Sequence, residues 1–277
     1  MSARAASIAA VPALVLAGIA CWEVCAARRD ATSVPGDAAW QAAAAAVRAG
    51  YRPGDLIVFA PAWVDPIGRR ELGDLIALPD AARMDAARYG RIWELAIRGA
   101  QASDTADLVP AVTEDHAGVR VRRYDRPPAV VVGDVLDRAA SATLSAPPPA
   151  TLPATPPGPG AHPAVVLAEV GFAPHRCVQV SPAPGTPLRI TFPAFPLGRT
   201  LVGYVGIADV FTRRDVRSPV RIDVELAGRV IASAGAGVDD GWVRFTATTP
   251  PGPADVTFVA RAADANRKLC FAAEARQ

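Results

Sequence analysis

Four side chains with binding chemistry follow a short apolar segment, Leu56–Ala60, which is typical of a buried strand. They are Trp63, Asp65, Arg69 and Arg70. Because ligands of open α/β sheets bind beyond the carboxyl ends of the strands, we expect a site here. An indole can stack on a sugar ring, a carboxylate can bind hydroxyl groups, and paired guanidinium groups can hold a phosphate or carboxylate. The alternative is that the indole packs in the core and the arginines begin a solvated helix.

The sequence carries no motif that would identify a catalytic reaction. It lacks a G-x-S-x-G elbow, an H-E-x-x-H zinc motif, a P-loop and a G-x-G-x-x-G loop. The three histidines, His116, His162 and His175, have no metal-ligand spacing with the cysteines. We therefore expect no catalytic residue, no metal site and no cofactor. The net charge of +2 predicts no nucleic-acid partner.

Two of the four cysteines, Cys177 and Cys270, lie in strand-like runs near the two ends of the last region. The first and last strands of a sandwich are often neighbours, so a disulfide between them is a candidate. Disulfides persist in oxidising compartments, which would place the protein outside the cytoplasm. The alternative is a pair of buried free thiols. Cys21 and Cys25 lie in an apolar segment at the N-terminus.

That N-terminal segment has no charged residue from Ala5 to Trp22, a length at the lower limit for a membrane-spanning helix. We predict that residues 1–29 are a signal anchor that tethers the protein to a membrane or a signal peptide cleaved near Val24–Ala26. A lipoprotein signal using Cys21 and a buried helix of a soluble domain are the remaining alternatives. The rest of the chain is expected in the periplasm or at the cell surface, or secreted if the signal is cleaved.

A proline-rich stretch, residues 147–163, predicts a linker between two domains. Residues 30–146 alternate helical and strand patterns, which favours a small α/β domain with a mainly parallel sheet. Residues 164–277 hold about eight or nine short strand patterns separated by turns, which is typical of a β-sandwich, with a jelly roll as the expected topology. The fold class predicted is therefore α+β and multidomain.

Residues 38–125 contain PGDLIVFAPAW and then YGRIWELAI after a helical stretch. This pattern resembles the soluble extracytoplasmic segment of glycosyltransferases that use lipid-linked sugars. The sequence lacks the many membrane helices and the membrane-proximal acidic residues that carry catalysis in that family. The resemblance therefore implies an envelope-sugar context without transferase activity.

Residues 164–276 contain an acid-ended strand pattern, a charged loop, VRIDVELAG and later DDGWVRF. This pattern resembles galactose-binding-like jelly-roll modules. The resemblance implies a ligand-facing loop set, Asp209, Arg213, Arg214 and Asp215, with Arg217 nearby. A solvated surface of ion pairs is the alternative for such a loop.

These observations favour an exported, membrane-tethered envelope protein that binds carbohydrate or another envelope component without catalysis. Two alternatives stay open. One is an enzyme acting on envelope glycans or glycolipids, with its site after the Leu56–Ala60 strand. The other is a protein–protein interaction module that binds an envelope protein.

Overall fold

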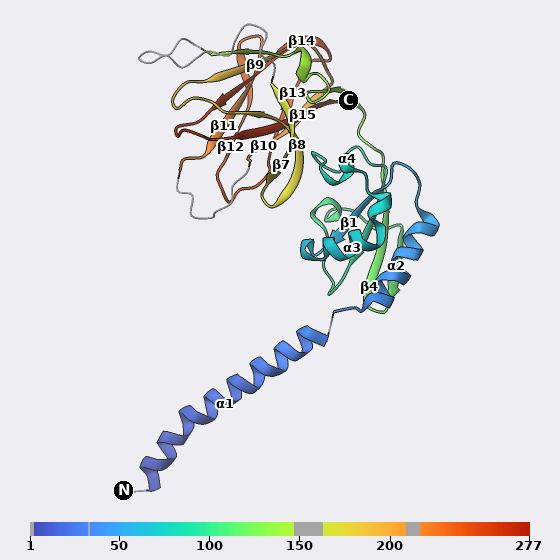
Figure 1. The fold of residues 1–277 in the computed structure, drawn as a ribbon, viewed down its shortest axis with the longest axis vertical. Coiled ribbons are helices and arrows are strands. Elements are labelled where there is room, and N and C mark those ends of the chain that lie inside the picture. The colour runs from blue at the N-terminus through green and yellow to red at the C-terminus, as the bar shows by residue number, and fades with distance from the viewer. Residues whose placement is uncertain (1–2, 33, 147–162, 209–216) are drawn as a thin grey trace. The chain divides into compact units, whose positions relative to one another are not determined.

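The computed structural model describes residues 3–32, 34–146, 163–208 and 217–277. Its contacts divide the chain into two compact units. Unit 1 comprises residues 1–76 and 90–126, and unit 2 comprises residues 77–89 and 127–277. Figure 1 labels most of the helices and strands.

Unit 1 holds a small sheet and several helices. Its elements are α1 (Ala3–Thr32), α2 (Asp37–Gly50), β1 (Leu56–Ala60), the 3₁₀ helix η1 (Ala62–Val64), α3 (Asp65–Leu72), η2 (Gly73–Leu75), β2 (Arg91–Ala96), η3 (Ser103–Thr105), β3 (Val112–His116) and β4 (Val119–Asp125).

The sheet of unit 1 has the strand order β1-β2-β4-β3 in the described chain. Only the β1–β2 pairing is parallel, and the other two are antiparallel. The expected mainly parallel sheet is therefore wrong. The reason is local, because β3 and β4 are joined by Ala117 and Gly118, which both have positive φ and form a tight hairpin turn. A parallel pair needs a long crossover, and the connection from β1 to β2 provides one.

Helix α2 covers this sheet with one apolar face. Trp40 and Val47 on that face are buried with Phe59 of β1 and Leu95 of β2 in one core. These helix residues recur at the spacing of an amphipathic helix, which explains why the segment folds against a sheet. The next helix, α3, approaches β1 closely, since a Cβ at Gly68 would lie only 2.0 Å from the Phe59 ring.

None of the helices in the described residues combines the length and the hydropathy that a membrane crossing requires. The transmembrane helix expected within residues 1–29 is therefore not supported.

Unit 2 is built mainly of strands. Its elements are α4 (Leu78–Ala81), β5 (Val131–Asp134), η4 (Ala139–Ser141), β6 (Thr143–Ser145), β7 (Ala164–Val170), β8 (Ala173–Val180), β9 (Leu188–Leu197), β10 (Thr200–Ile207), β11 (Val220–Leu226), β12 (Arg229–Ala236), β13 (Val243–Thr248), β14 (Gly252–Arg261) and β15 (Leu269–Arg276).

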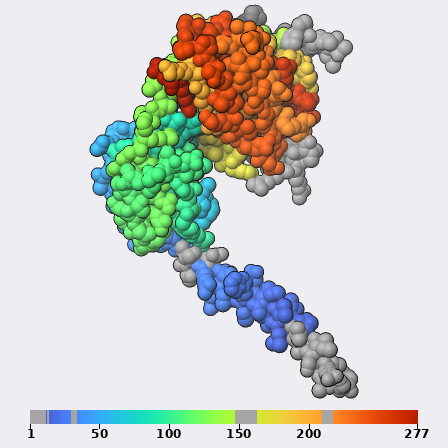
Figure 2. Space-filling view, turned by 180° about the vertical axis from the view of Figure 1, so that it is seen from behind, coloured from blue at the N-terminus to red at the C-terminus, as the bar shows by residue number. Residues whose placement is uncertain are grey.

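The strands of unit 2 form two antiparallel sheets, which confirms the predicted β-sandwich. The β15 sheet has the order β13-β10-β15-β8-β7, with β5 also paired to β15, and the β14 sheet has the order β12-β11-β14-β9-β6. Figure 2 shows how the later strands, coloured orange and red, form a continuous surface. The chain passes repeatedly between the sheets from β9 onward. The jelly-roll topology stays a prediction.

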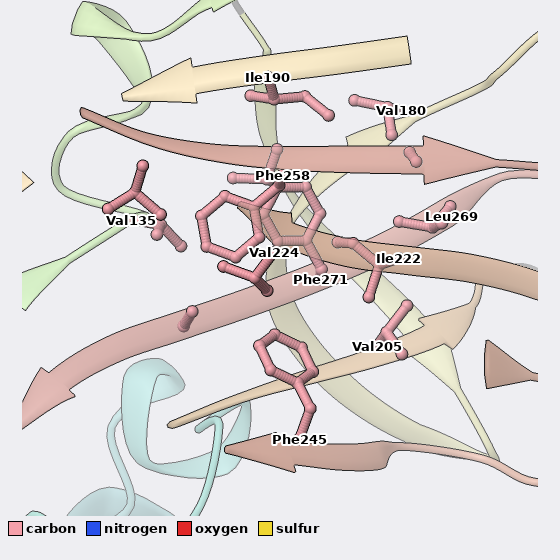
Figure 3. Close-up of a cluster of buried hydrophobic side chains, with 14 of the residues drawn as sticks. Val135, Val180, Ile190, Val205, Ile222, Val224, Phe245, Phe258, Leu269 and Phe271 are labelled. Atoms are coloured by element: carbon pink, nitrogen blue, oxygen red, sulfur yellow. The ribbon is translucent and has the colours of Figure 1, made fainter. Parts of the chain in front are cut away.

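The core of unit 2 lies between the two sheets, where alternate residues of each strand meet. Figure 3 shows Phe258, Phe271 and Phe245 in this core. The rings of Phe258 and Phe271 have their centroids 4.9 Å apart. Burial of each such ring contributes about 2–3 kcal/mol, so this cluster is a main source of stability.

The composition of unit 2 differs from the sequence expectation, which assigned residues 30–146 to one domain and 164–277 to the other. Residues 77–89 and the described residues from 127 onward belong to unit 2. Strand β5 pairs with β15, and β6 pairs with β9. The proline-rich linker expected at 147–163 lies outside the described residues, apart from Pro163.

Residues 77–89, which we call the strap, contact the face of the β15 sheet that is turned away from the core. Arg276 of β15 binds Asp85 of the strap at 2.8 Å. Arg88 of the strap binds Glu274 of β15 at 2.6 Å and also pairs with Asp134 of β5. The alternation of β15 explains this arrangement, because Phe271 and its in-phase neighbours face the core while Glu274 and Arg276 face the strap.

A disulfide joins Cys177 of β8 to Cys270 of β15, with their Cα atoms 5.5 Å apart. This finding confirms the predicted pairing. The bond closes a loop between residues separated by 93 positions, and by chain entropy such a loop stabilises the fold by about 4 kcal/mol.

Candidate functional site

The first predicted site lies in unit 1, where the carboxyl ends of β1 and β2 meet. Ala60 pairs with Ala96 in the parallel register. Trp63 follows in η1 and is 54% exposed, so the alternative of a buried core residue is wrong. The Arg98 guanidinium carbon lies 5.7 Å from the Trp63 ring centroid. The two side chains form an exposed cation–π pair just beyond the strand ends.

The other three residues predicted for this site are engaged in ion pairs. Arg69 donates from Nε to Asp65 at 2.5 Å, one turn apart on α3. Arg70 donates to Asp37 at 2.7 Å and to Glu71 at 2.8 Å. The structure brings Asp65 and Arg69 together and joins Arg70 to the start of α2 instead. Exposed pairs of this kind contribute little to stability.

The second predicted set, Asp209, Arg213, Arg214 and Asp215, lies outside the described residues. Its role in ligand binding stays a prediction from the sequence.

A groove of about 380 Å³ lies in unit 2, at the end of the sandwich where β7 turns into β8. It is lined by two carboxylates, one aromatic ring, two aliphatic side chains and two glycines. Its lining residues are Glu169, Gly171, Phe172, Ile207, Val238, Asp239 and Gly241. They come from the β7–β8 hairpin, the end of β10 and the connection from β12 to β13. A volume of this size is within the range of small-molecule and sugar sites.

The β7–β8 turn presents Phe172 at the rim of the groove. Val170 pairs with Ala173, so Gly171 and Phe172 alone make the turn. Both have positive φ, 59° and 65°. Such two-residue turns need left-handed residues, which glycine and asparagine tolerate and a bulky aromatic residue rarely adopts. The Phe172 side chain is 70% exposed in this strained conformation. Strain of this kind clusters at functional sites.

Glycines let the two walls of the groove approach each other. A Cβ on Gly171 would lie 2.9 Å from the Gly241 Cα atom, so the hairpin turn contacts the β12–β13 connection backbone to backbone. That connection is closed by a hydrogen bond from the Gly237 N–H to the Asp240 carboxylate at 2.7 Å.

The residue that follows this connection, Trp242, is held from three sides. Its ring stacks on His175 at 4.5 Å and on Tyr204 at 5.9 Å between centroids. Its Nε1–H donates to the Met84 carbonyl of the strap at 3.2 Å. Trp242 is therefore a half-buried residue that packs within unit 2, and we do not assign it to ligand binding. It fixes the end of the loop that carries Asp239 and Gly241.

His175 anchors the strap beside this stack. Its Nδ1 lies 3.1 Å from the Arg83 carbonyl oxygen, and since a carbonyl only accepts, Nδ1 carries the proton. Burial lowers the pKa of His175 below its ordinary 6.5. On the same face of the β15 sheet, burial raises the pKa of the Asp134 carboxyl. The Arg88 guanidinium acts in the opposite direction, but its effect is smaller. Neutral His175 and the ion pairs together hold the strap in place.

The two carboxylates of the groove lack the ion pairs that Asp134 and Glu274 form with Arg88 of the strap. Neither Glu169 nor Asp239 forms a hydrogen bond or an ion pair within the described chain. The described residues also hold no group of three or more His, Cys, Asp or Glu side chains that would suit a metal ion. The groove can therefore offer two carboxylates to an incoming ligand.

Phe172 is not among the residues predicted from the sequence, which are charged residues and a tryptophan. The signal was present in EVGFAPH, where an aromatic residue follows glycine between two strand patterns. A two-residue turn with glycine first forces the second residue to the surface. An aromatic residue at that position was the sign of an exposed ring.

No protein-family model matches the sequence. The comparison with curated proteins also gives no match. Among solved structures, the tandem CBM51 modules of a family 98 glycoside hydrolase from Streptococcus pneumoniae align with a TM-score of 0.34 and 12% identity, over 58% of this chain and 57% of theirs. CBM51-2 in complex with GlcNAc and INT domains of ZmpB from Clostridium perfringens align with a TM-score of 0.32 and 14% identity, over 61% of this chain and 39% of theirs.

A structure of carbohydrate-binding modules described as promiscuous, from the β-sandwich superfamily, aligns with a TM-score of 0.32 and 14% identity, over 59% of this chain and 69% of its own. This chain spans less than two thirds of the length of the first two structures. At TM-scores of this size the likeness supports no argument about family or function. The glycosyltransferase resemblance expected for residues 38–125 is not shown by any of these comparisons.

Proposed function

We propose that this chain is a non-catalytic glycan-binding protein and that the groove at the β7–β8 turn is its binding site. The observation that carries the proposal is the exposed Phe172 ring, held in a strained turn beside two carboxylates that have no partner in the described chain. An aromatic face packs against the C–H groups of a sugar ring. Carboxylates accept hydrogen bonds from sugar hydroxyls. Because the acceptor is charged, these hydrogen bonds are stronger than those between neutral groups.

We propose further that the protein works outside the cytoplasm. The Cys177–Cys270 disulfide supports this location, because such bonds are rare in reducing compartments.

The test is a glycan-array screen of the full chain with the disulfide oxidised, using neutral, amino and acidic glycans. Phe172→Asn is the site variant, since asparagine keeps the left-handed turn while removing the ring. Leu167→Ala is the matched control, because Leu167 is 52% exposed on the same hairpin but does not line the groove. We expect selective binding that the site variant loses and the control keeps.

Two results would contradict the proposal. One is the absence of binding to any glycan by a folded, oxidised sample, which would favour a protein–protein interaction module. The other is binding that Phe172→Asn leaves unchanged, which would move the site elsewhere on the molecule.

Unit 1 offers a second candidate surface for the same class of ligand. Trp63 is exposed at the carboxyl end of β1, where the sequence predicted ligand binding. A Trp63→Ala variant in the same array measures whether this ring contributes. Glycan binding that weakens in this variant while the fold is kept would place a second contact there.

A further inference from the structure

Among the described residues, the lining of the groove carries negative charge that no positive side chain compensates. Glu169 and Asp239 are its charged residues, and no arginine, lysine or histidine lines it in the described chain. Both carboxylates are exposed and lack a hydrogen bond or ion pair there. On the same sheet, Glu274 is paired with Arg88 and with Arg276. The unpaired state of the groove carboxylates is therefore a local feature of this site.

Unpaired carboxylates beside a ring discriminate strongly between classes of sugar. A protonated amine donates up to three hydrogen bonds and carries the opposite charge, and hydrogen bonds between charged groups are about twice as strong as neutral ones. A neutral acetamido group offers one N–H and no charge. A uronate or sulfated sugar would place like charges together, which costs affinity.

A metal ion is the competing cationic occupant. Calcium takes six to eight oxygen ligands, and two side-chain carboxylates supply only part of that set. No suitable cluster of three or more ligating side chains is present among the described residues. An organic cation with an apolar face matches the groove better, because Phe172 supplies the surface on which that face can pack.

We infer that the groove selects glycans with free amino groups, that is, unacetylated hexosamine residues. The inference rests on the proposed glycan-binding function and adds the class of sugar. Glu169 and Asp239 bind the ammonium group, and the Phe172 ring packs against the C–H face of the same or the next sugar.

The experiment is a calorimetric titration of the full, oxidised chain with three oligosaccharides of equal length. They are a β-1,4-glucosamine tetramer, its fully N-acetylated form and a tetragalacturonate. We expect the amine form to bind at least about tenfold more tightly than the acetylated form. This preference should shrink when the salt concentration rises from about 0.05 to 0.5 M, because salt screens exposed charges.

The deciding variant is Glu169→Gln/Asp239→Asn, which keeps the shape of both side chains and removes their charge. We expect it to abolish the preference for the amine form. Asp137→Asn is the control, because it removes an exposed negative charge of unit 2 outside the groove. Thermal unfolding of each variant checks that the fold is kept.

The outcomes separate this inference from the proposed function. Equal binding of the amine and acetylated forms, lost in Phe172→Asn, keeps the glycan-binding function and overturns the amine selectivity. A preference that survives in the double variant also overturns it. Tighter binding of the galacturonate overturns it and points to Arg213 and Arg214 instead. No binding of any glycan, here or on the array, removes the proposed function itself.

Discussion

Phe172 occupies a backbone conformation that disfavours every bulky side chain. Its φ of 65° lies in the left-handed region, where a non-glycine residue costs about 1–2 kcal/mol. The two-residue turn leaves no alternative, because Val170 and Ala173 are already paired. A role in binding explains a phenylalanine in this position better than a role in the stability of the fold does.

The first prediction follows from that strain. Phe172→Asn should raise the free energy of unfolding by up to about 1 kcal/mol, because asparagine tolerates the left-handed region. Urea denaturation of the oxidised full chain measures the change. A loss of stability would show that the ring packs the fold together, and it would weaken the case for a binding role.

The second prediction concerns Trp63, which is 54% exposed. Trp63→Ala should lower the free energy of unfolding by less than about 1 kcal/mol, the range of an exposed cation–π pair. Trp40→Ala provides the contrast, since that indole is buried and its loss should cost about 3–5 kcal/mol. Thermal unfolding of both variants makes the comparison, and a large loss at position 63 would restore the packing interpretation.

At this scale the sequence predicted one pair of residues that lie far apart along the chain. The Cys177–Cys270 pair follows from two strand patterns and their positions. The pairing of Arg70 with Asp37 could not be predicted, because the two residues are 33 positions apart and only the packing of α2 on α3 brings them together.

The strap is the segment whose structure differs most from the one that its sequence pattern predicts. Residues 80–89 have a helical pattern, yet the helix ends at Ala81 and the remainder lies on the β15 sheet. Tertiary contacts override helix propensity here, because Asp85 and Arg88 find charged partners on β15. The face that the strap covers could not be deduced from local periodicity.

The third prediction is a pH dependence at the strap. The folded pKa of His175 is lowered by burial, so the unfolded chain binds more protons near its ordinary value of 6.5. The free energy of unfolding should therefore decrease as the pH falls below about 6.5. This decrease should stop once the pH is below the pKa of His175 in the folded chain. Urea denaturation between pH 7.5 and 5.5 measures this slope.

The control for this effect is His175→Gln, whose amide can still donate to the Arg83 carbonyl but does not titrate. It should flatten the slope between those pH values. An unchanged slope in this variant would assign the effect to other groups.

The two compact units differ in their residues from the domains expected from composition. Composition marks residues 147–163 as a linker, but pairing of β5 with β15 and of β6 with β9 extends unit 2 toward the N-terminus. The sandwich class was predictable from about eight or nine short strand patterns in the region that begins at residue 164. The contributions of residues 77–89 and 127–145 were not, because they depend on contacts distant in sequence.

The fourth prediction tests this organisation. Residues 164–277 expressed alone should be much less stable than the full chain or should aggregate. Removing the strap takes Asp85 from Arg276 and Arg88 from Glu274, and the loss of these partly buried ion pairs is costly. Thermal unfolding and near-ultraviolet circular dichroism compare this fragment with residues 127–277, which keep β5 and β6 and should be intermediate. Equal stability of all three would contradict it.

The strap also constrains how this protein can change during evolution. Small domains are usually exchanged between proteins as continuous segments that begin and end at linkers. Here the sandwich draws residues 77–89 from between two paired strands of unit 1, β1 and β2. A recombination event at the proline-rich stretch would separate the sandwich from its own covering segment. We therefore expect relatives of this chain to inherit both units together, with insertions confined to surface loops.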